Sequence, residues 1–201
     1  MSALHARLDR ARREIPESPT LSDFRAPASL VQAEDEALEA AARVITAHAE
    51  IAALFGPRAE RVPWALPRAR RARRGDRIVF LGPVVARRGV HLLREVMRET
   101  HRPLVVPGRD LEGGFDWGRS VERAAADPLE GAAAVVLPAW VEHSPRELLR
   151  AAARGVPVLA SAACGLEGVA GVRTVPPGDE RALGQASREL SREEVQARAE
   201  R

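Results

Sequence analysis

Short apolar runs alternate with segments of helical periodicity from residue 77 to the end of the chain. The apolar runs lie at residues 78–81, 103–107, 132–137, 156–160 and 171–175. Helical segments lie at residues 90–99 and 145–154 and from about residue 179, and a weaker one follows the glycine-rich stretch after residue 108. Buried strands separated by helices are typical of a parallel, doubly wound sheet. The sequence therefore predicts an α/β fold with a Rossmann-like parallel sheet.

The chain before residue 77 predicts a smaller unit. It has a helical start and an irregular stretch within residues 1–30, followed by alternating helical and extended segments at residues 30–42, 43–46, 49–55 and 59–64. These segments indicate a remnant of a second α/β domain.

The arginine-rich stretch from Pro67 to Arg77 has no large apolar residue and cannot be core. A solvated linker is the favoured interpretation over a site for nucleic acid or an acidic membrane, because no aromatic residues are interleaved with its arginines. The expected division is 1–67 for the remnant of the N-terminal (acceptor-side) domain, 68–76 for the linker, 77–190 for the main domain and 191–201 for a charged tail.

Composition excludes several classes of protein. All basic residues are arginine, and they are interspersed with acidic residues to a formal net charge of +3, so nucleic acid is not an expected partner. No apolar run approaches the ~20 residues that span a bilayer, and the charged N-terminus is unlike a secretory signal. The single cysteine, Cys164, excludes an internal disulfide. We expect a cytoplasmic protein without a transmembrane segment.

Ligands of open α/β sheets bind at the carboxyl ends of the strands, so the loops that follow the predicted strands are the candidate sites. After residues 132–137, Ser144 is a candidate helix cap, Pro145 fits the first helical position and Glu147 completes a capping box. The free N–H groups of such a helix start favour an anion such as a diphosphate. A helix that is simply well capped explains the same residues.

Residues 138–160 (PAWVEHSPRELLRAAARGVPVLA) resemble the donor-binding core of glycosyltransferase family four, the group 1 glycosyl transferases of the GT-B fold. That family has two glutamates eight positions apart. Glu142 matches the first, which the resemblance places beside the transferred sugar, and Arg150 stands where the second holds the ribose. A guanidinium cannot accept hydrogen bonds, so this ribose contact is lost or remodelled. A surface position on the helix, near Glu147, is the other interpretation of Arg150.

The resemblance extends upstream to residues 78–93 (IVFLGPVVARRGVHLL). Gly82 matches the glycine of the family's first loop and Arg88 its second cation, while Pro83 replaces the first cation and Arg87 compensates for it. Gly108 matches the glycine after the second strand. Downstream, residues 175–179 (VPPGD) match a further motif of the family.

The resemblance implies a C-terminal donor-binding domain with a truncated N-terminal part. The implied activity is transfer of a sugar from a nucleotide-sugar donor to an unknown acceptor, with retention of anomeric configuration and with neither a metal ion nor a cofactor. Glu142 is then the catalytic residue. The implied donor-binding residues are Gly82, Arg87, Arg88, Gly108, His143, Ser144, Pro145 and Arg150.

Two alternatives remain open. The chain is a truncated or degenerate, non-catalytic binding protein, or it is another sugar-phosphate or nucleotide enzyme on the same sheet. His48 beside residues 43–46 is either a residue of the cleft or a packing histidine. We further expect Gly82, Arg88, Glu142 and Ser144 to converge on one cleft. We also expect the face left by a missing acceptor domain to be apolar or covered by residues 1–30, so that the chain forms a homo-oligomer or binds a partner subunit.

Overall fold

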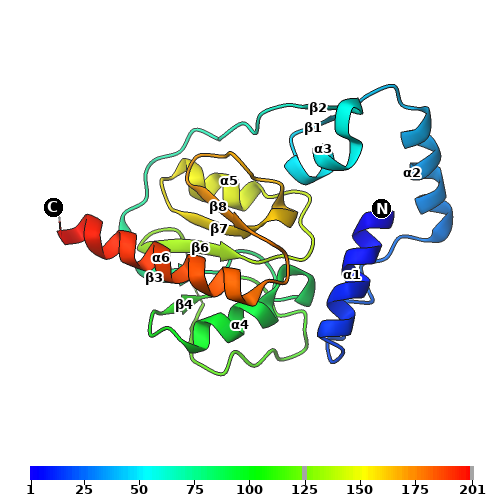
Figure 1. Ribbon diagram of the computed structural model, residues 1–201. Coiled ribbons are helices and arrows are strands. Elements are labelled where there is room, and N and C mark those ends of the chain that lie inside the picture. The colour runs from blue at the N-terminus through cyan, green and yellow to red at the C-terminus, as the bar shows by residue number, and fades with distance from the viewer. Residues whose placement is uncertain (124–125, 200–201) are drawn as a thin grey trace.

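The computed structural model describes residues 1–123 and 126–199, and its main body is a six-stranded sheet in which every neighbouring pair is parallel. The strand order is β5-β4-β3-β6-β7-β8 (Figure 1). The strands are β3 (Arg74–Val79), β4 (Leu104–Val105), β5 (Val121–Glu122), β6 (Ala132–Leu137), β7 (Val158–Ser161) and β8 (Val172–Val175). The prediction of a Rossmann-like parallel sheet is confirmed.

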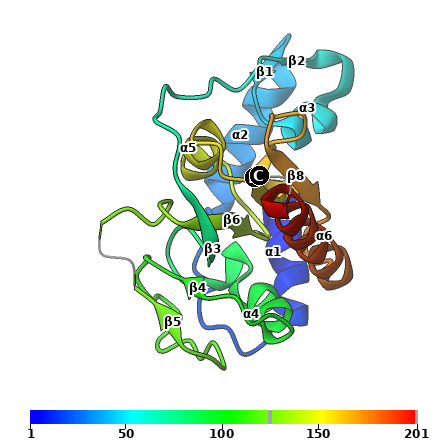
Figure 2. The same ribbon diagram turned by 90° about the vertical axis from the view of Figure 1, so that its left-hand side faces the viewer.

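Helices cover both faces of this sheet, as a doubly wound fold requires. Figure 2 shows α4 (Val90–Arg98) and α6 (Glu180–Ala199) on one face and α5 (Arg146–Ala153) on the other. All six residues of β6, the central apolar strand, are buried between these layers. Its predicted boundaries are confirmed, because a run of alanine, valine and leucine without a polar residue has no solvent-facing side.

The N-terminal part lies beside the carboxyl edge of the sheet (Figure 1). Its elements are α1 (Ser2–Glu14), α2 (Ala28–Ala40), β1 (Val44–Thr46), α3 (Ala49–Phe55), the 3-10 turn η1 (Gly56–Arg58) and β2 (Ala59–Arg61). Strands β1 and β2 pair in parallel as a two-stranded sheet. The expected small α/β unit is therefore present.

Residues 1–30 cover an apolar part of the main domain. A buried cluster joins Leu8, Ala11, Ile15 and Leu21 of this segment to Ala86, Trp140 and Val141 of the loops that follow β3 and β6. Trp140 is only 2% exposed beneath this cover. Residues 1–30 therefore cover this apolar part of the main domain, and the expectation that an acceptor domain would meet it stays a prediction.

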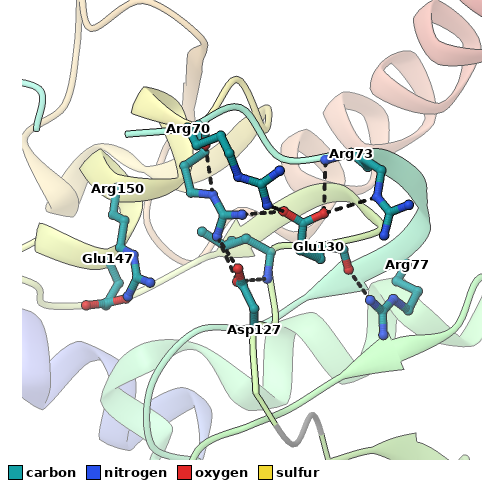
Figure 3. Close-up of polar contacts among 9 residues, drawn as sticks. Arg70, Arg73, Arg77, Asp127, Glu130, Glu147 and Arg150 are labelled. Carbon is teal, nitrogen blue, oxygen red and sulfur yellow. Dashed lines mark hydrogen bonds and ion pairs between the residues drawn. The ribbon is translucent and has the colours of Figure 1, made fainter. Parts of the chain in front are cut away.

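The linker is shorter than predicted, because β3 already begins at Arg74. Arg154, which is 6% exposed, fixes the preceding residues to the main domain by donating from Nε to the carbonyl of Arg70 at 3.3 Å. Its two other nitrogens bind Asp127 and Glu130, and Figure 3 shows Glu130 beside Arg70 and Arg73. The end of the linker is therefore held by side chains at the amino edge of the sheet.

Two further elements differ from the predictions. The weak helix expected after residue 108 is absent from residues 109–123, where Asp110 accepts the N–H groups of Glu112, Gly114 and Phe115 and β5 follows. A carboxylate that takes successive amide protons favours turns over a helix. The charged tail predicted at 191–201 continues α6 as far as Ala199.

Candidate donor-binding site

A cavity of about 330 Å³ lies where β3 and β6 end and α5 begins. Its lining consists of Leu81, Gly82, Pro83, Arg88, Leu137, Glu142, Ser144, Pro145, Arg146, Glu147 and Leu148. Two of the loops that were predicted as candidate sites, the loop after β3 and the loop before α5, therefore meet at this cavity. Gly82, Arg88, Glu142 and Ser144 converge on this one cavity as expected.

Arg88 and Glu142 form an ion pair in the wall of the cavity, with Arg88 Nη2 2.6 Å from Glu142 Oε2. The side chains are 19% and 5% exposed, respectively, so the carboxylate is nearly removed from water. Arg88 Nη1 also donates to the carbonyl of Leu81 at 3.1 Å. Charge-assisted contacts of this kind are stronger than neutral hydrogen bonds, so the pair is a stable feature of the cavity wall.

Gly82 makes room for this guanidinium. Its φ of 112° lies in a region that side chains rarely adopt, and a Cβ atom there would collide with Arg88. Glycine therefore fits this loop because it adopts the positive φ freely and leaves space for Arg88 at the end of β3.

Glu142 also organises the start of α5, and it replaces the predicted capping box. Its Oε1 accepts the N–H of Ser144 at 2.8 Å. The cap residue of α5 is Pro145, no side chain caps the helix, and the first helical residue is Arg146. The predicted cap at Ser144 is wrong because the helix begins one residue later, which takes the serine hydroxyl out of register with the first-turn N–H groups.

The helix start nevertheless offers donors to the cavity. Within residues 1–123 and 126–199, no acceptor is recorded for the N–H groups of Glu147 and Leu148 in the first turn of α5. Both residues line the cavity. Unpaired N–H groups and the positive end of the helix dipole favour a bound anion.

Arg146 is a cation of the cavity that sequence reasoning did not select. It is the exposed first residue of α5 and lines the same cavity as Arg88. The sequence indicates this residue, because a basic residue directly after a Ser-Pro helix start lies beside the N–H groups that favour an anion.

Gly108 lies behind the cavity and not in its wall. A Cβ atom on Gly108 would collide with the carbonyl oxygen of Gly82, so the glycine lets the loops after β3 and β4 touch. Arg123 donates to the Gly108 carbonyl at 2.8 Å.

Arg87 points away from Arg88 towards the N-terminal segment. Its guanidinium carbon lies 4.4 Å from the ring centre of Phe24. Burial, and then the neighbouring charge of Arg88, lower the pKa of Arg87. Its backbone carbonyl accepts the N–H of Trp140 at 2.8 Å, which ties the two site loops together.

Arg150 does not line the cavity. It is 55% exposed on α5 and pairs with Glu147, with 3.6 Å between Nη1 and Oε2 (Figure 3). His143 is exposed and lines a different cavity, on the side of the N-terminal unit.

His48 is a buried packing histidine that joins the N-terminal unit to the site. Its Nδ1 accepts the N–H of Ile51 at 3.4 Å, so the proton is assigned to Nε2. Nε2 lies 3.1 Å from the carbonyl of Glu142 and 3.2 Å from that of Ala163. The imidazole therefore fixes the backbone that carries Glu142.

Cys164 lies under the same loop as an inert packing residue. It is fully buried, and burial raises the pKa of its thiol to about 12. A thiol of that kind is not a nucleophile at neutral pH.

Comparisons with known proteins identify the fold. No family model and no curated protein matches the sequence. Among solved structures, sucrose-phosphate synthase from Thermosynechococcus elongatus is similar to 83% of this chain, with a TM-score of 0.57 and 20% identity. The lipopolysaccharide outer core galactosyltransferase WaaB is similar to 76% of the chain, with a TM-score of 0.57 and 16% identity. TarM is similar over 76%, with a TM-score of 0.55 and 14% identity.

The chain spans only part of these proteins. The similarity covers 53% of the sucrose-phosphate synthase, 54% of WaaB and 37% of TarM. Within residues 1–123 and 126–199, no helix is both long and apolar enough to cross a membrane. The chain has the Rossmann-like fold of GT-B glycosyltransferases, over a length that corresponds to about half of such an enzyme.

Proposed function

We propose that the chain binds the diphosphate of a nucleotide sugar in the cavity beside Arg88 and that Glu142 contacts the donor sugar. The main observation that supports this proposal is the Arg88–Glu142 pair in the wall of a cavity at the carboxyl edge of the sheet. Arg146 and the free N–H groups of the α5 start add positive charge on the opposite side. A cavity with two guanidinium groups and a helix start matches an anion with several oxygens.

The reaction proposed for this site is sugar transfer to a hydroxyl group. The acceptor oxygen forms a bond to the anomeric carbon, and the bond between that carbon and the phosphate oxygen breaks. The nucleoside diphosphate leaves with the electron pair, and the hydroxyl proton passes to it. Arg88, Arg146 and the α5 N–H groups stabilise the charge that develops on the leaving diphosphate.

Isothermal titration of the protein with UDP, GDP and ADP tests the binding step. We expect one of the three to bind and Arg88→Gln to weaken it by about tenfold or more, because a hydrogen bond to a charged group contributes roughly 1.5–3 kcal/mol. Arg98→Gln is the matched control, since Arg98 is 59% exposed on α4 and does not line the cavity. Absence of binding to all three nucleotides contradicts the proposal.

A second candidate, binding without transfer, is favoured by the position of Arg150. This residue pairs with Glu147 on the exposed side of α5, where the family resemblance expects a glutamate that holds the ribose. If the ribose of a bound nucleotide reaches beyond the cavity to position 150, Arg150→Glu strengthens UDP binding by about tenfold and leaves inorganic pyrophosphate binding unchanged. Nucleotide binding without any sugar release from UDP-glucose, GDP-mannose or ADP-glucose supports this second candidate.

A further inference from the structure

A second cavity, of about 620 Å³, lies on the other side of Glu142. It is enclosed by α1, α2 and α3 of the N-terminal unit and by the loop that follows β6. Glu142 lines both cavities, and His143 lines only the second. A ligand in the second cavity therefore lies next to Glu142, the residue that is proposed to contact the donor sugar.

The wall of the second cavity is mainly apolar. Its large apolar side chains are Met1, Leu4, Leu38, Val44, Ile51, Leu54, Phe55 and Val141. The volume lies within the range of small-molecule sites, which are typically apolar with a few polar groups that fix orientation.

Many polar side chains of this wall already have partners. Arg7 Nη1 donates to Glu50 Oε2 at 2.7 Å, and the N-terminal amine binds Glu34. Both ring nitrogens of His48 are used by Ile51 and by the carbonyls of Glu142 and Ala163. A sugar acceptor, with a hydroxyl on almost every carbon, would have to break these contacts to satisfy its own groups.

We propose that the second cavity is the acceptor subsite and that it takes a hydroxyl group carried on an aromatic or other apolar body. This inference rests on the proposed donor function for its chemistry, but the binding of the apolar body depends only on the cavity. The hydroxyl group faces Glu142 and His143, and the apolar body packs between α1 and α3. The N-terminal unit thereby contributes the substrate specificity of the site.

Two exposed leucines give a matched test of the subsite. Leu54 lines the cavity and is 61% exposed, whereas Leu111 is 52% exposed and lies outside it. A charge at either position is tolerated by the fold because each side chain already reaches water. The probe is 4-methylumbelliferone, a fluorescent phenol with an apolar ring system, and maltose is the polar comparison.

We expect 4-methylumbelliferone to bind, maltose not to bind, and UDP not to displace the phenol. Leu54→Glu weakens binding by about tenfold or more, because a carboxylate in the apolar wall must be desolvated, and Leu111→Glu leaves it unchanged. Ala3→Trp, at an exposed position of α1 that lines the cavity, fills the space and also weakens binding. Binding of maltose instead, displacement by UDP, or an equal effect of both leucine variants overturns the proposal.

The two proposals fail in different ways. If nucleotides bind and the phenol does not, the acceptor inference is wrong and the donor site stands. If the phenol binds and no nucleotide does, the cavity takes an apolar ligand but the donor function is wrong, and with it the acceptor role.

Discussion

Arg88 and Glu142 neutralise each other at a point where each is also expected to contact the donor. The 2.6 Å pair is nearly buried, so the diphosphate and the carboxylate compete for one guanidinium. We predict that Glu142→Gln strengthens nucleoside diphosphate binding by about tenfold and abolishes transfer, since the amide has no charge to hold Arg88. Isothermal titration and a sugar-release assay measure the two effects.

Weaker nucleotide binding by Glu142→Gln would contradict this competition. If Glu142→Gln weakens nucleotide binding as much as Arg88→Gln does, the carboxylate orients Arg88 for the ligand and does not compete with it. Glu142→Asp then restores part of the affinity, because it keeps the charge and shortens the side chain by one methylene group.

At the scale of single residues, the sequence predicted which residues form the site better than it predicted the contacts between them. Gly82, Arg88, Glu142 and Ser144 follow predicted strands, and the edge of a parallel sheet brings such residues together. The ion pair joins residues 54 positions apart, and no local pattern indicates that Arg88 turns to Glu142 and Arg87 to Phe24. Those directions are set by the tertiary packing of the N-terminal segment.

At the scale of single elements, helix α5 connects the site to the opposite edge of the sheet. Its amino end borders the cavity, and Arg154 at its carboxyl end binds Asp127 at 2.6 Å and Glu130 at 2.6 Å. Loss of Arg154 removes the ion-pair partner of Asp127, whereas Glu130 keeps the exposed Arg70 and Arg73 (Figure 3). Both carboxylates are partly shielded from water.

We predict that Arg154→Met lowers the free energy of unfolding by about 2–4 kcal/mol. Arg150→Met is the matched control on the same helix, because Arg150 is 55% exposed and its pair with Glu147 is a surface contact. That variant changes stability by less than about 0.5 kcal/mol. Urea unfolding of the two variants measures the difference, and equal effects would show that the network contributes nothing beyond a surface ion pair.

The same network of ion pairs makes the free energy of unfolding depend on pH in the acidic range. The hydrogen bond from Arg154 is the main cause that lowers the pKa of Asp127 below its ordinary value of 3.8. A carboxyl group with a lowered pKa stabilises the fold above its unfolded pKa, and this contribution is lost as the pH falls through the folded pKa. We therefore predict that Asp127→Asn destabilises the protein at pH 7 and that its difference from the wild type shrinks below pH ~4. Urea midpoints between pH 3 and pH 7 measure this, and a constant difference contradicts it.

Element boundaries were predictable where the side chains alone decide them. Strand β6 has six buried apolar residues, and its boundaries follow from the sequence. The start of α5 does not, because a carboxylate two residues earlier takes the N–H of Ser144. The stretch after β4 has the composition of a weak helix, but Asp110 and its glycines favour turns.

At the scale of the whole molecule, the described chain has two apolar cores that meet at the candidate site. The larger one fills the sheet and its helices, and the smaller one joins α1 to Trp140 and Val141. The predicted coverage by residues 1–30 follows from the apolar character of that face. The sequence did not indicate that α1 would also enclose the second cavity, because this depends on where α2 and α3 pack.

Substitutions in the smaller core test whether the packing of α1 is needed for the solution state and for ligand binding. Leu8 is fully buried in it, whereas Ala6 is exposed on the same helix. We predict that Leu8→Asp detaches α1, because an unpaired carboxylate in this core costs more than the leucine contacts contribute. Trp140 then reaches water, so the tryptophan emission shifts to the red and the exposed apolar face causes self-association in sedimentation experiments.

Ala6→Asp puts the same charge on the same helix without entering the core, so its emission and sedimentation stay those of the wild type. The sheet has its own larger core, so the far-ultraviolet circular dichroism of Leu8→Asp retains the strand signal. Nucleotide binding in the cavity beside Arg88 persists in this variant, whereas binding of 4-methylumbelliferone is lost with the wall that α1 provides. Loss of both ligands together would mean that α1 holds the loop of Glu142 in place, and the donor site would then depend on the N-terminal unit as much as the acceptor subsite does.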